Sequence, residues 1–380
     1  MLLVLGHLLQ ALGWSSMLLL PVYIGHLGGS HTQIGMIMAM ASVGGLLFRP
    51  LAGWSLDRVG RRPTLIAGTI ILSAAMGLIG LADDIGPLIY GARFLVGVGT
   101  GTLMTGYFTF VSDFIPESRR TEGIALFGIS GLAPIAINAV VDRLEMPLSD
   151  LNLLFPCLGV VVFISIFALI PVPETATGQR EDAEPISLAT VQEAIGSTPL
   201  LSTWLATIVF SGLVAVYMAF VTVTAKQQGI AHPAELWAAY ALGAVGVRLF
   251  GARLPDKLGP HNFVVPALCS YAGACLIAAS ASSSLTFCAS GLLAGLGHGY
   301  CFPVLTGQVV TRMPSHLRGI GIAMFTAIWE VTSLGATPAF GWVADTFDEA
   351  TMFTLAAVLV IILSGIWVLL EFRSQRLLRD

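Results

Sequence analysis

Twelve apolar runs divide this 380-residue chain, and each is long enough to cross a bilayer as a helix, for which about 20 apolar residues suffice. With one exception, the connections between the runs are short and carry Gly, Pro, Asp or Arg. The first run follows Met1 directly and is too long for the apolar core of a signal peptide, so we expect it to be a membrane helix. The sequence therefore predicts an all-α membrane protein with transmembrane helices at 2–24, 32–54, 64–82, 87–113, 122–141, 151–171, 200–225, 234–254, 262–281, 284–310, 320–343 and 350–371.

The composition excludes an ordinary soluble protein. Apolar residues make up 56% of the chain and charged residues 11%, whereas a soluble domain has about 25% charged residues. Lipid must therefore solvate much of the surface. The net charge of −4 is thinly spread and indicates no nucleic-acid partner. The five cysteines lie in or beside apolar runs without metal-site spacing, so we expect neither a metal nor a cofactor.

The one long polar stretch, residues 172–199, predicts a cytoplasmic linker between an N-terminal six-helix bundle (1–171) and a C-terminal six-helix bundle (200–380). Cytoplasmic loops carry an excess of Lys and Arg, which gives the orientation. If both termini are cytoplasmic, only Arg143 and Lys226 fall outside. The cytoplasmic set is Arg58, Arg61, Arg62, Arg119, Arg120, Arg180, Arg253, Lys257, Arg312, Arg318, Arg373, Arg376 and Arg379. We therefore expect a multi-pass protein of a bacterial inner membrane with both termini cytoplasmic.

The two halves are repeats of one another. The segment from Gly97 to Gly101 matches Gly295 to Gly299, 198 positions later. Residues 116–127 match residues 314–325 at the same offset, and residues 57–60 match 256–259 at an offset of 199. Parallel repeats of six helices suit a transporter whose halves rock around a central site.

The strongest motif lies between the second and third runs and reads Arg49-Pro-Leu-Ala-Gly53-Trp-Ser-Leu-Asp57-Arg58-Val-Gly60-Arg61-Arg62-Pro63. It resembles the G-x-L-x-D-R-x-G-R-R signature of the major facilitator superfamily, and the helix number, repeat, linker and charge bias agree with that family. The resemblance implies two pseudo-symmetric six-helix bundles. It also implies a latch for the outward-facing state, with Asp57 near the start of the eleventh helix and an arginine of the loop near Asp113. The expected latch residues are Gly53, Asp57, Arg58, Gly60, Arg61, Arg62 and Asp113.

The chemistry of this loop is compatible with that role. Gly53 and Gly60 permit a tight turn, Asp57 can face the positive end of a helix dipole, and the arginines can pair with carboxylates or lipid phosphates. The alternative is a set of cationic anchors that only determines topology.

The fourth run contains Arg93-Phe-Leu-Val-Gly97-Val-Gly99, which resembles the family pattern R-x-x-x-G-x-G. The resemblance implies that Arg93 takes part in proton coupling. Because Arg93 lies only about 10 Å from the end of its run by helix rise, snorkelling to the interface is the alternative. The glycines are expected to serve close helix packing, and Pro134 predicts a kink in the fifth helix.

Glu330 is the one acidic residue near the middle of a predicted membrane helix. Ionisable groups at that depth are costly and mark proton or ion pathways, so we expect Glu330 to carry protons. A structural carboxylate, hydrogen-bonded between helices, is the alternative. His298 is a second candidate for proton coupling or substrate binding, with packing as its alternative.

The resemblance also implies that the first, fourth, seventh and tenth helices line the substrate cavity. Candidate cavity residues are His7, Gln10, Trp14, Tyr107, Asn138, Tyr217, Tyr300 and Gln308, and Trp204 and Trp329 are further cavity or interface candidates. Packing is the alternative for each of them.

These features favour a secondary transporter that exports small amphipathic organic compounds in exchange for protons. The sequence has no GxxxxGK[ST] loop for ATP, and its helices carry few charges. Uptake or facilitated diffusion of a small metabolite is one alternative, and a non-transporting sensor or scaffold is another. An enzyme is not expected, because ionisable groups are isolated in the helices. Expected partners are a small-molecule substrate, protons and lipids, with the chain as a monomer.

Overall fold

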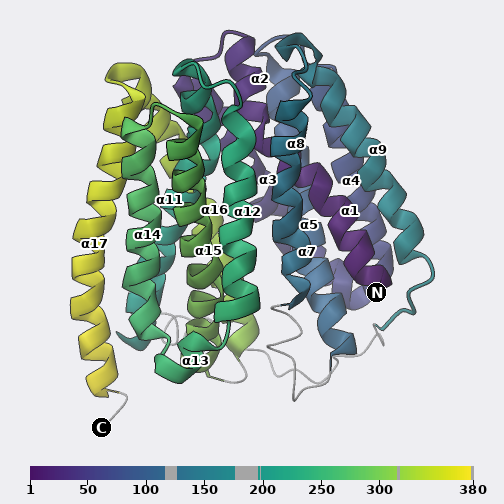
Figure 1. Ribbon diagram of the computed structural model, residues 1–380. Coiled ribbons are helices and arrows are strands. Elements are labelled where there is room, and N and C mark those ends of the chain that lie inside the picture. Colours follow the sequence, from purple (N-terminus) through teal and green to yellow (C-terminus); the bar gives the residue numbers. More distant parts are fainter. Residues whose placement is uncertain (116–125, 176–195, 197, 315–316, 378–380) are drawn as a thin grey trace.

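The computed structural model describes residues 1–115, 126–175, 196, 198–314 and 317–377 (Figure 1). Most of the predicted linker, with Arg119, Arg120, Arg180 and Arg379, lies outside these residues. The described part of the chain is helical and has no strand. In lipid the backbone must satisfy its own hydrogen bonds, which is why apolar runs of this length become helices.

The described part of the first half contains four long helices and two interrupted ones, α1–η1–α2 and α7–η3–α8. Its elements are α1 (Leu2–Ser15), η1 (Ser16–Leu18), α2 (Leu20–His26), α3 (His31–Arg58), α4 (Arg61–Gly80), α5 (Pro87–Phe114), α7 (Ile129–Leu132), η3 (Ala133–Ala136), α8 (Ile137–Arg143), η4 (Leu148–Asp150) and α9 (Leu151–Leu169).

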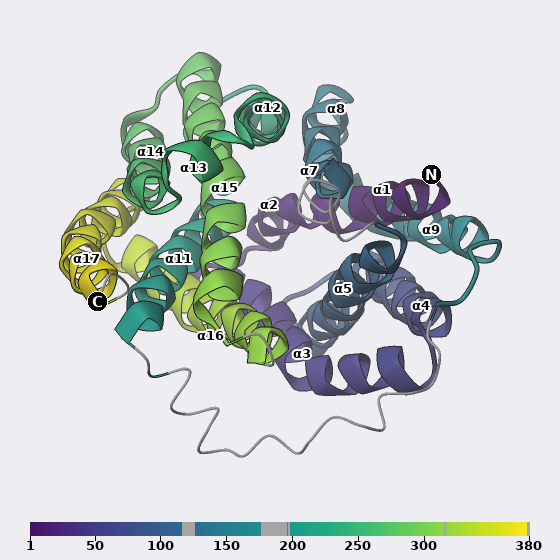
Figure 2. The ribbon, with the colours of Figure 1, turned by 90° about the horizontal axis from the view of Figure 1, so that it is seen from below.

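The described part of the second half contains five long helices and one interrupted one, α12–η6–α13. Its elements are α11 (Thr198–Gln227), η5 (Pro233–Glu235), α12 (Leu236–Gly246), η6 (a π-helical turn, Val247–Gly251), α13 (Leu254–Leu258), α14 (His261–Ser280), α15 (Ser284–Arg312), α16 (Arg318–Thr346) and α17 (Glu349–Leu377). Figure 2 shows the helices of the two halves as two groups, with α3 beside α16 where the groups meet.

Ten helices of the described chain are long and apolar enough to cross a membrane. The predicted runs at 122–141 and 234–254 are absent from that set because both are interrupted. The 3-10 turn η3 contains Pro134, which confirms the predicted break in that helix. The run at 234–254 is interrupted by the π-helical turn η6, and Pro255 lies in the first turn of α13, which follows it. The all-helical architecture with two repeated halves is confirmed.

The repeated glycines bring helices into backbone contact, as predicted. A Cβ on Gly97 of α5 would lie 1.9 Å from the carbonyl oxygen of Ala41 in α3. A Cβ on the repeat mate, Gly295 of α15, would lie 2.1 Å from the carbonyl oxygen of Tyr240 in α12. Both distances are far below contact, so only glycine permits these two crossings.

The described halves contact each other mainly along two seams: α3 packs against α16, and the segment α7–η3–α8 packs against α12. Helix α11 also contacts α2. We call the end of the bundle with Arg61, Arg253 and Lys257 the cationic end, and the end with Asp83 and Asp348 the acidic end. The candidate site lies in the first of these seams, where a charged residue of α3 and one of α16, from different halves, face each other.

Candidate functional site

A charge cluster lies in the seam between α3 and α16. Arg49 Nη2 donates to Glu330 Oε1 at 3.1 Å, and the two side chains are 18% and 19% exposed. The Ser42 hydroxyl also contacts the Glu330 carboxylate, and Arg93 of α5 is close enough for its charge to act on Glu330. We call Arg49, Arg93 and Glu330 the charge cluster; it holds two cations and one anion drawn from both halves.

The charge cluster contains unused hydrogen-bonding capacity. The buried Nε atoms of Arg49 and Arg93 have no hydrogen-bond partner among the described atoms. Gly45 permits this arrangement, because a Cβ there would lie 3.1 Å from Glu330 Oε1. Thus Arg93 and Glu330, both selected from the sequence, come together, and the cation bonded to Glu330 is Arg49.

An aromatic cluster surrounds His298 of α15. The Tyr240 hydroxyl lies 2.6 Å from His298 Nδ1, a hydrogen bond whose donor depends on the histidine tautomer. The His298 ring centre lies 5.3 Å from that of Phe210, 6.2 Å from that of Phe302 and 6.3 Å from that of Trp329. Trp329 precedes Glu330 in α16, so the aromatic cluster and the charge cluster share this helix.

Several cavity candidates are bonded inside their own half. His7 Nδ1 lies 2.7 Å from Ser130 Oγ, Asn138 Nδ2 donates to the Ser15 carbonyl oxygen at 3.1 Å, and the Tyr217 and Ser290 hydroxyls lie 2.7 Å apart. Tyr107, Asn138 and Tyr217 are fully buried, and Gln10 and Gln308 are almost completely buried. In this state His7, Asn138 and Tyr217 therefore bond to residues of their own half. Trp14, Tyr300 and Trp329 are half-buried, and Trp204 is buried.

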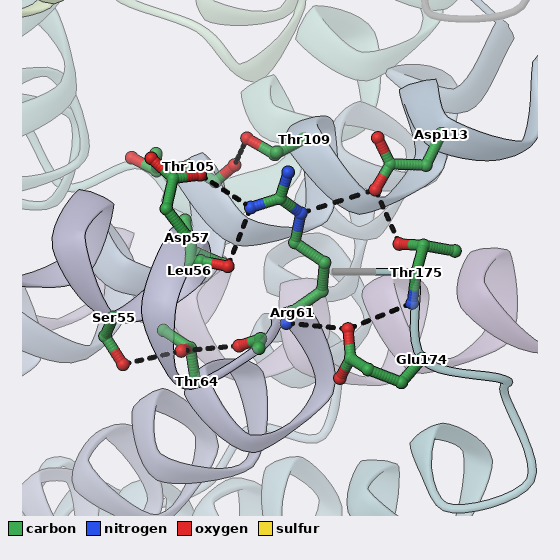
Figure 3. Close-up of polar contacts among 11 residues, drawn as sticks. Ser55, Leu56, Asp57, Arg61, Thr64, Thr105, Thr109, Asp113, Glu174 and Thr175 are labelled. Carbon is green, nitrogen blue, oxygen red and sulfur yellow. Dashed lines mark hydrogen bonds and ion pairs between the residues drawn. The ribbon is translucent and has the colours of Figure 1, made fainter. Parts of the chain in front are cut away.

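Arg61 is the centre of a network at the cationic end of the first half (Figure 3). Its Nη1 donates to Asp57 Oδ1 at 2.8 Å and to the Leu56 carbonyl oxygen at 2.7 Å, and its Nε donates to Asp113 Oδ2 at 3.3 Å. The arginine–Asp113 contact implied by the resemblance is therefore present. Thr175 donates to the same Asp113 oxygen at 2.6 Å, which connects α3, α4, α5 and the start of the linker.

The other loop residues take different positions. Gly60 has φ of +128°, a conformation that favours glycine, and Gly53 has no neighbour within 4 Å of an added Cβ. Glu174 accepts the backbone N–H groups of Arg61 and Arg62, each at 2.9 Å. Arg58 is exposed.

The resemblance places Asp57 near the start of the eleventh helix. In this structure its ion-pair partner, within the described chain, is Arg61 of the same half, and its side chain is 60% exposed. The contact of Asp57 with the second half is therefore not seen in this state. The polar bonds that cross between the halves lie instead at the acidic end and in the middle of the bundle, as far as the described residues show.

A clamp at the acidic end joins α3 to α16 and α17. Asp345 Oδ1 accepts the backbone N–H of His31 at 2.8 Å, and Asp345 Oδ2 accepts the Thr32 hydroxyl at 2.6 Å. The His31 ring lies between Asp345 (Nδ1–Oδ1 2.9 Å) and Glu349 (Nε2–Oε1 3.1 Å). We call His31, Thr32, Asp345 and Glu349 the His31 clamp. Asp348 lies between α16 and α17, and its carboxylate accepts a hydrogen bond from the backbone N–H of Thr351 in α17. This bond lowers the pKa of the Asp348 carboxyl.

The other seam is also bonded at the acidic end. Asp142 Oδ2 accepts the backbone N–H of Ala234 at 2.9 Å, and Arg143 pairs with Glu235. Both contacts join the first half to the second. Together with the His31 clamp, they show that the halves are fastened to each other at the acidic end in this state.

Sequence reasoning missed four charged side chains inside the bundle. Arg49 was placed in the loop motif and not beside Glu330, and Arg248 of η6 was not assigned to any site. The pair Arg312–Glu371, with an Nη2–Oε1 distance of 2.5 Å, lies 9% and 5% exposed inside the second half. The available signal was the position of Arg49 and Arg248 inside apolar runs. No three His, Cys, Asp or Glu residues of the described chain lie close enough together to hold a metal ion.

Comparisons with known proteins agree with this architecture. The family model described as Major Facilitator Superfamily matches residues 3–334 and 236–378. The staphylopine export protein of Staphylococcus aureus is 24% identical over 372 residues, which cover 94% of this chain and 93% of that protein. The multidrug resistance protein MdtL of Salmonella dublin is 29% identical over 154 residues, which cover 40% of this chain and 39% of that protein.

Solved structures share the fold. The human organic anion transporter MFSD10 superposes with a TM-score of 0.69 at 17% identity, covering 97% of this chain and 98% of that chain. A POT family transporter in complex with a thioalcohol-conjugated peptide superposes with a TM-score of 0.82 at 10% identity, covering 98% and 96%. At these identities the likeness shows the fold alone.

Proposed function

The chain belongs to the major facilitator superfamily and is a membrane transporter, not an enzyme; on this premise we propose that it exports small amphipathic organic compounds in exchange for protons. The observation that carries the proposal is the bond between Glu330 and Arg49, which joins the two halves at the middle of the bundle. Because this carboxylate bonds Arg49 across the seam, a proton that binds to Glu330 changes the strength of the contact between the halves.

The coupling follows from the charge of Glu330. When it is ionised, its carboxylate attracts the Arg49 guanidinium and holds α3 against α16. A proton on Glu330 removes that charge, so the attraction between two opposite charges is lost and only a hydrogen bond from the Arg49 guanidinium to a neutral carboxyl group is left. The halves then separate more easily, and the proton leaves when the ion pair forms again. Proton binding and rocking are thus thermodynamically linked.

Export is supported by the relatives, whose names describe staphylopine export and multidrug resistance. The aromatic cluster around His298 supports an amphipathic cargo, because ring faces offer apolar contact and the tyrosine and histidine offer hydrogen bonds. We place the chain as a monomer in a bacterial inner membrane, with both termini in the cytoplasm. The relatives' bacterial sources and the arginine-rich cationic end support that orientation.

The Arg61 network supports a latch in the cycle. In this state it is complete within the first half, and the halves are fastened at the acidic end. When the cationic ends approach each other, Asp57 can exchange Arg61 for a group of the second half. The network, with Asp57 released from Arg61, would then stabilise the state in which the cationic ends are closed.

Mass spectrometry of cells and medium tests the proposal. Strains are compared that express the wild type, Glu330→Gln, or Asp83→Asn at equal abundance, with one strain expressing none. Asp83 is an exposed carboxylate at the acidic end and serves as the matched control. A compound enriched in the medium with wild type and Asp83→Asn, but not with Glu330→Gln, is the expected result.

Three results contradict the proposal. Enrichment of a compound inside the cells would mean uptake instead of export. Export by Glu330→Gln at the wild-type rate would mean that the proton is carried elsewhere, and His298→Gln would be measured next. A protein that changes no compound in either compartment would be a sensor or scaffold.

A further inference from the structure

Arg248 is the repeat mate of Arg49. The two arginines are separated by 199 positions, the same offset that relates Asp57 to Asp256 in the repeated loop motif. Arg49 lies in α3 of the first half and Arg248 in η6, which continues α12 of the second half. The repeat therefore gives each half one arginine at an equivalent position: Arg49 in α3, which packs against α16, and Arg248 in the turn that continues α12, which packs against α7–η3–α8.

The two arginines differ in their partner across the seam. Arg49 bonds Glu330 of α16. The position equivalent to Glu330 at an offset of 198 is Leu132, the last residue of α7, and α7 packs against α12. One seam therefore has an arginine and a carboxylate, and the equivalent position of the other seam has an arginine and a leucine.

The surroundings of Arg248 supply no anion in place of that carboxylate. Its buried Nε has no hydrogen-bond partner among the described atoms. Arg248 is close enough to Tyr240 and His298 for its charge to act on them, and both are neutral or cationic partners. A membrane-embedded cation without a counter-ion is costly, and such residues face substrate pathways.

The backbone at this position is also irregular. Val247–Gly251 forms a π-helical turn, a feature frequent at functional sites. Gly251 makes room for Tyr300, whose hydroxyl would lie 2.3 Å from a Cβ at that position. The turn thus brings the arginine beside α15 and the aromatic cluster of His298.

We propose that Arg248 binds a carboxylate of the cargo while the aromatic cluster contacts the apolar part of the same molecule. A single guanidinium matches one monoanionic carboxylate through two parallel hydrogen bonds. The cargo carboxylate takes the place that Glu330 holds in the other seam. This inference rests on the proposed export function and narrows its substrate class to amphipathic carboxylic acids.

Binding to the purified full-length chain tests the inference without a proton gradient. The probes are benzoate, phenylacetate and N-benzoylglycine, each compared with its methyl ester by isothermal titration. The wild type is expected to bind at least one of the carboxylates about tenfold or more tightly than its ester. Arg248→Gln is expected to reduce that ratio to about one, whereas Arg373→Gln, an exposed arginine of α17, keeps it.

A second pair of variants changes Leu132, the repeat equivalent of Glu330 in α7. Leu132→Glu provides an internal carboxylate and is expected to abolish the preference for the acid, and Leu132→Gln is its uncharged control and is expected to keep the preference. This pair tests the site even if Arg248→Gln does not fold, as judged by size-exclusion elution and thermal unfolding. Equal binding of acid and ester to the wild type, no saturable binding of any acid, or an unchanged ratio in folded Arg248→Gln would overturn the inference.

Failure of this inference is distinguishable from failure of the export proposal. Glu330→Gln is expected to keep the acid-over-ester ratio, because Glu330 lies in the other seam, and to lose coupled export. A normal ratio with uncoupled transport by the wild type would contradict only the proton-coupling proposal. Coupled export of an uncharged compound, with no preference for acids, would contradict only the Arg248 site.

Discussion

Arg49 and Glu330 form an ion pair across the two halves of the protein, with 3.1 Å between Nη2 and Oε1 although 281 positions separate them in the chain. Each is the other's oppositely charged neighbour in the seam between α3 and α16. The pair is partly shielded from solvent, so the removal of one member leaves the other charge in an unfavourable place.

We therefore expect Arg49→Gln and Glu330→Gln to be non-additive in stability. Each single change removes the ion pair, whereas the double variant removes both charges together. The coupling free energy is expected to be about 0.5–3 kcal/mol, as for residues in direct contact. Unfolding of the purified variants in sodium dodecyl sulfate at fixed lipid content measures it. Additive effects of the two changes would show that the pair does not stabilise this state.

Loss of the Arg61 network is expected to alter the conformational equilibrium. Arg61→Ala removes the bonds to Asp57, Asp113 and the Leu56 carbonyl oxygen at once. We expect slower transport with normal membrane insertion, because α3, α4 and α5 lose their common contact at the cationic end. Lys257→Ala, at an exposed cation of the same end in the second half, is the control. Equal transport rates for the two variants would mean that the loop acts only in topology.

The His31 clamp is expected to make closure at the acidic end depend on pH. A protonated His31 forms ion pairs with both Asp345 and Glu349, so this stabilisation is present at low pH and is lost as the pH rises and the imidazole becomes neutral. Gln227, the remaining polar side chain near His31 Nε2, is uncharged.

Spin labels at Asp84→Cys and Ser282→Cys, with the five native cysteines replaced by alanine, can report this closure. The short-distance population is expected to fall as the pH rises from 5 to 9, roughly the range in which histidines titrate. His31→Gln is expected to remove the pH dependence. If the dependence persists in that variant, another group controls the acidic end.

Glycine contacts between helices can be tested by a matched pair of alanine substitutions. Gly97→Ala places a Cβ 1.9 Å from the Ala41 carbonyl oxygen, so α3 and α5 must separate. We expect a loss of about 1–3 kcal/mol in the free energy of unfolding. Gly77→Ala, in α4 with no neighbour within 4 Å, is expected to be neutral or stabilising by about 0.5–1 kcal/mol. A stable Gly97→Ala variant would show that the crossing can relax.

Much of the architecture could be predicted from the sequence because membrane helices are local. A run of about 20 apolar residues forms a helix in lipid whatever its neighbours are, and the repeat requires only a comparison of the chain with itself. The break at Pro134 could be predicted for the same reason, since proline removes a helical hydrogen bond within its own turn. The π-helical turn at Arg248 could not, because no residue type specifies it.

The partners of the polar residues depended on tertiary structure. His7 and Asn138 face neighbours inside one bundle, and Glu330 faces Arg49 of the other half, yet all three are polar residues in apolar runs. The facing of a membrane helix is set by packing against helices far away in the chain, and lipid and protein are equally apolar neighbours. The sequence by itself thus determined the spans, the repeat and the distribution of charge. Only the tertiary structure decided which charges meet, because that depends on how the two halves dock.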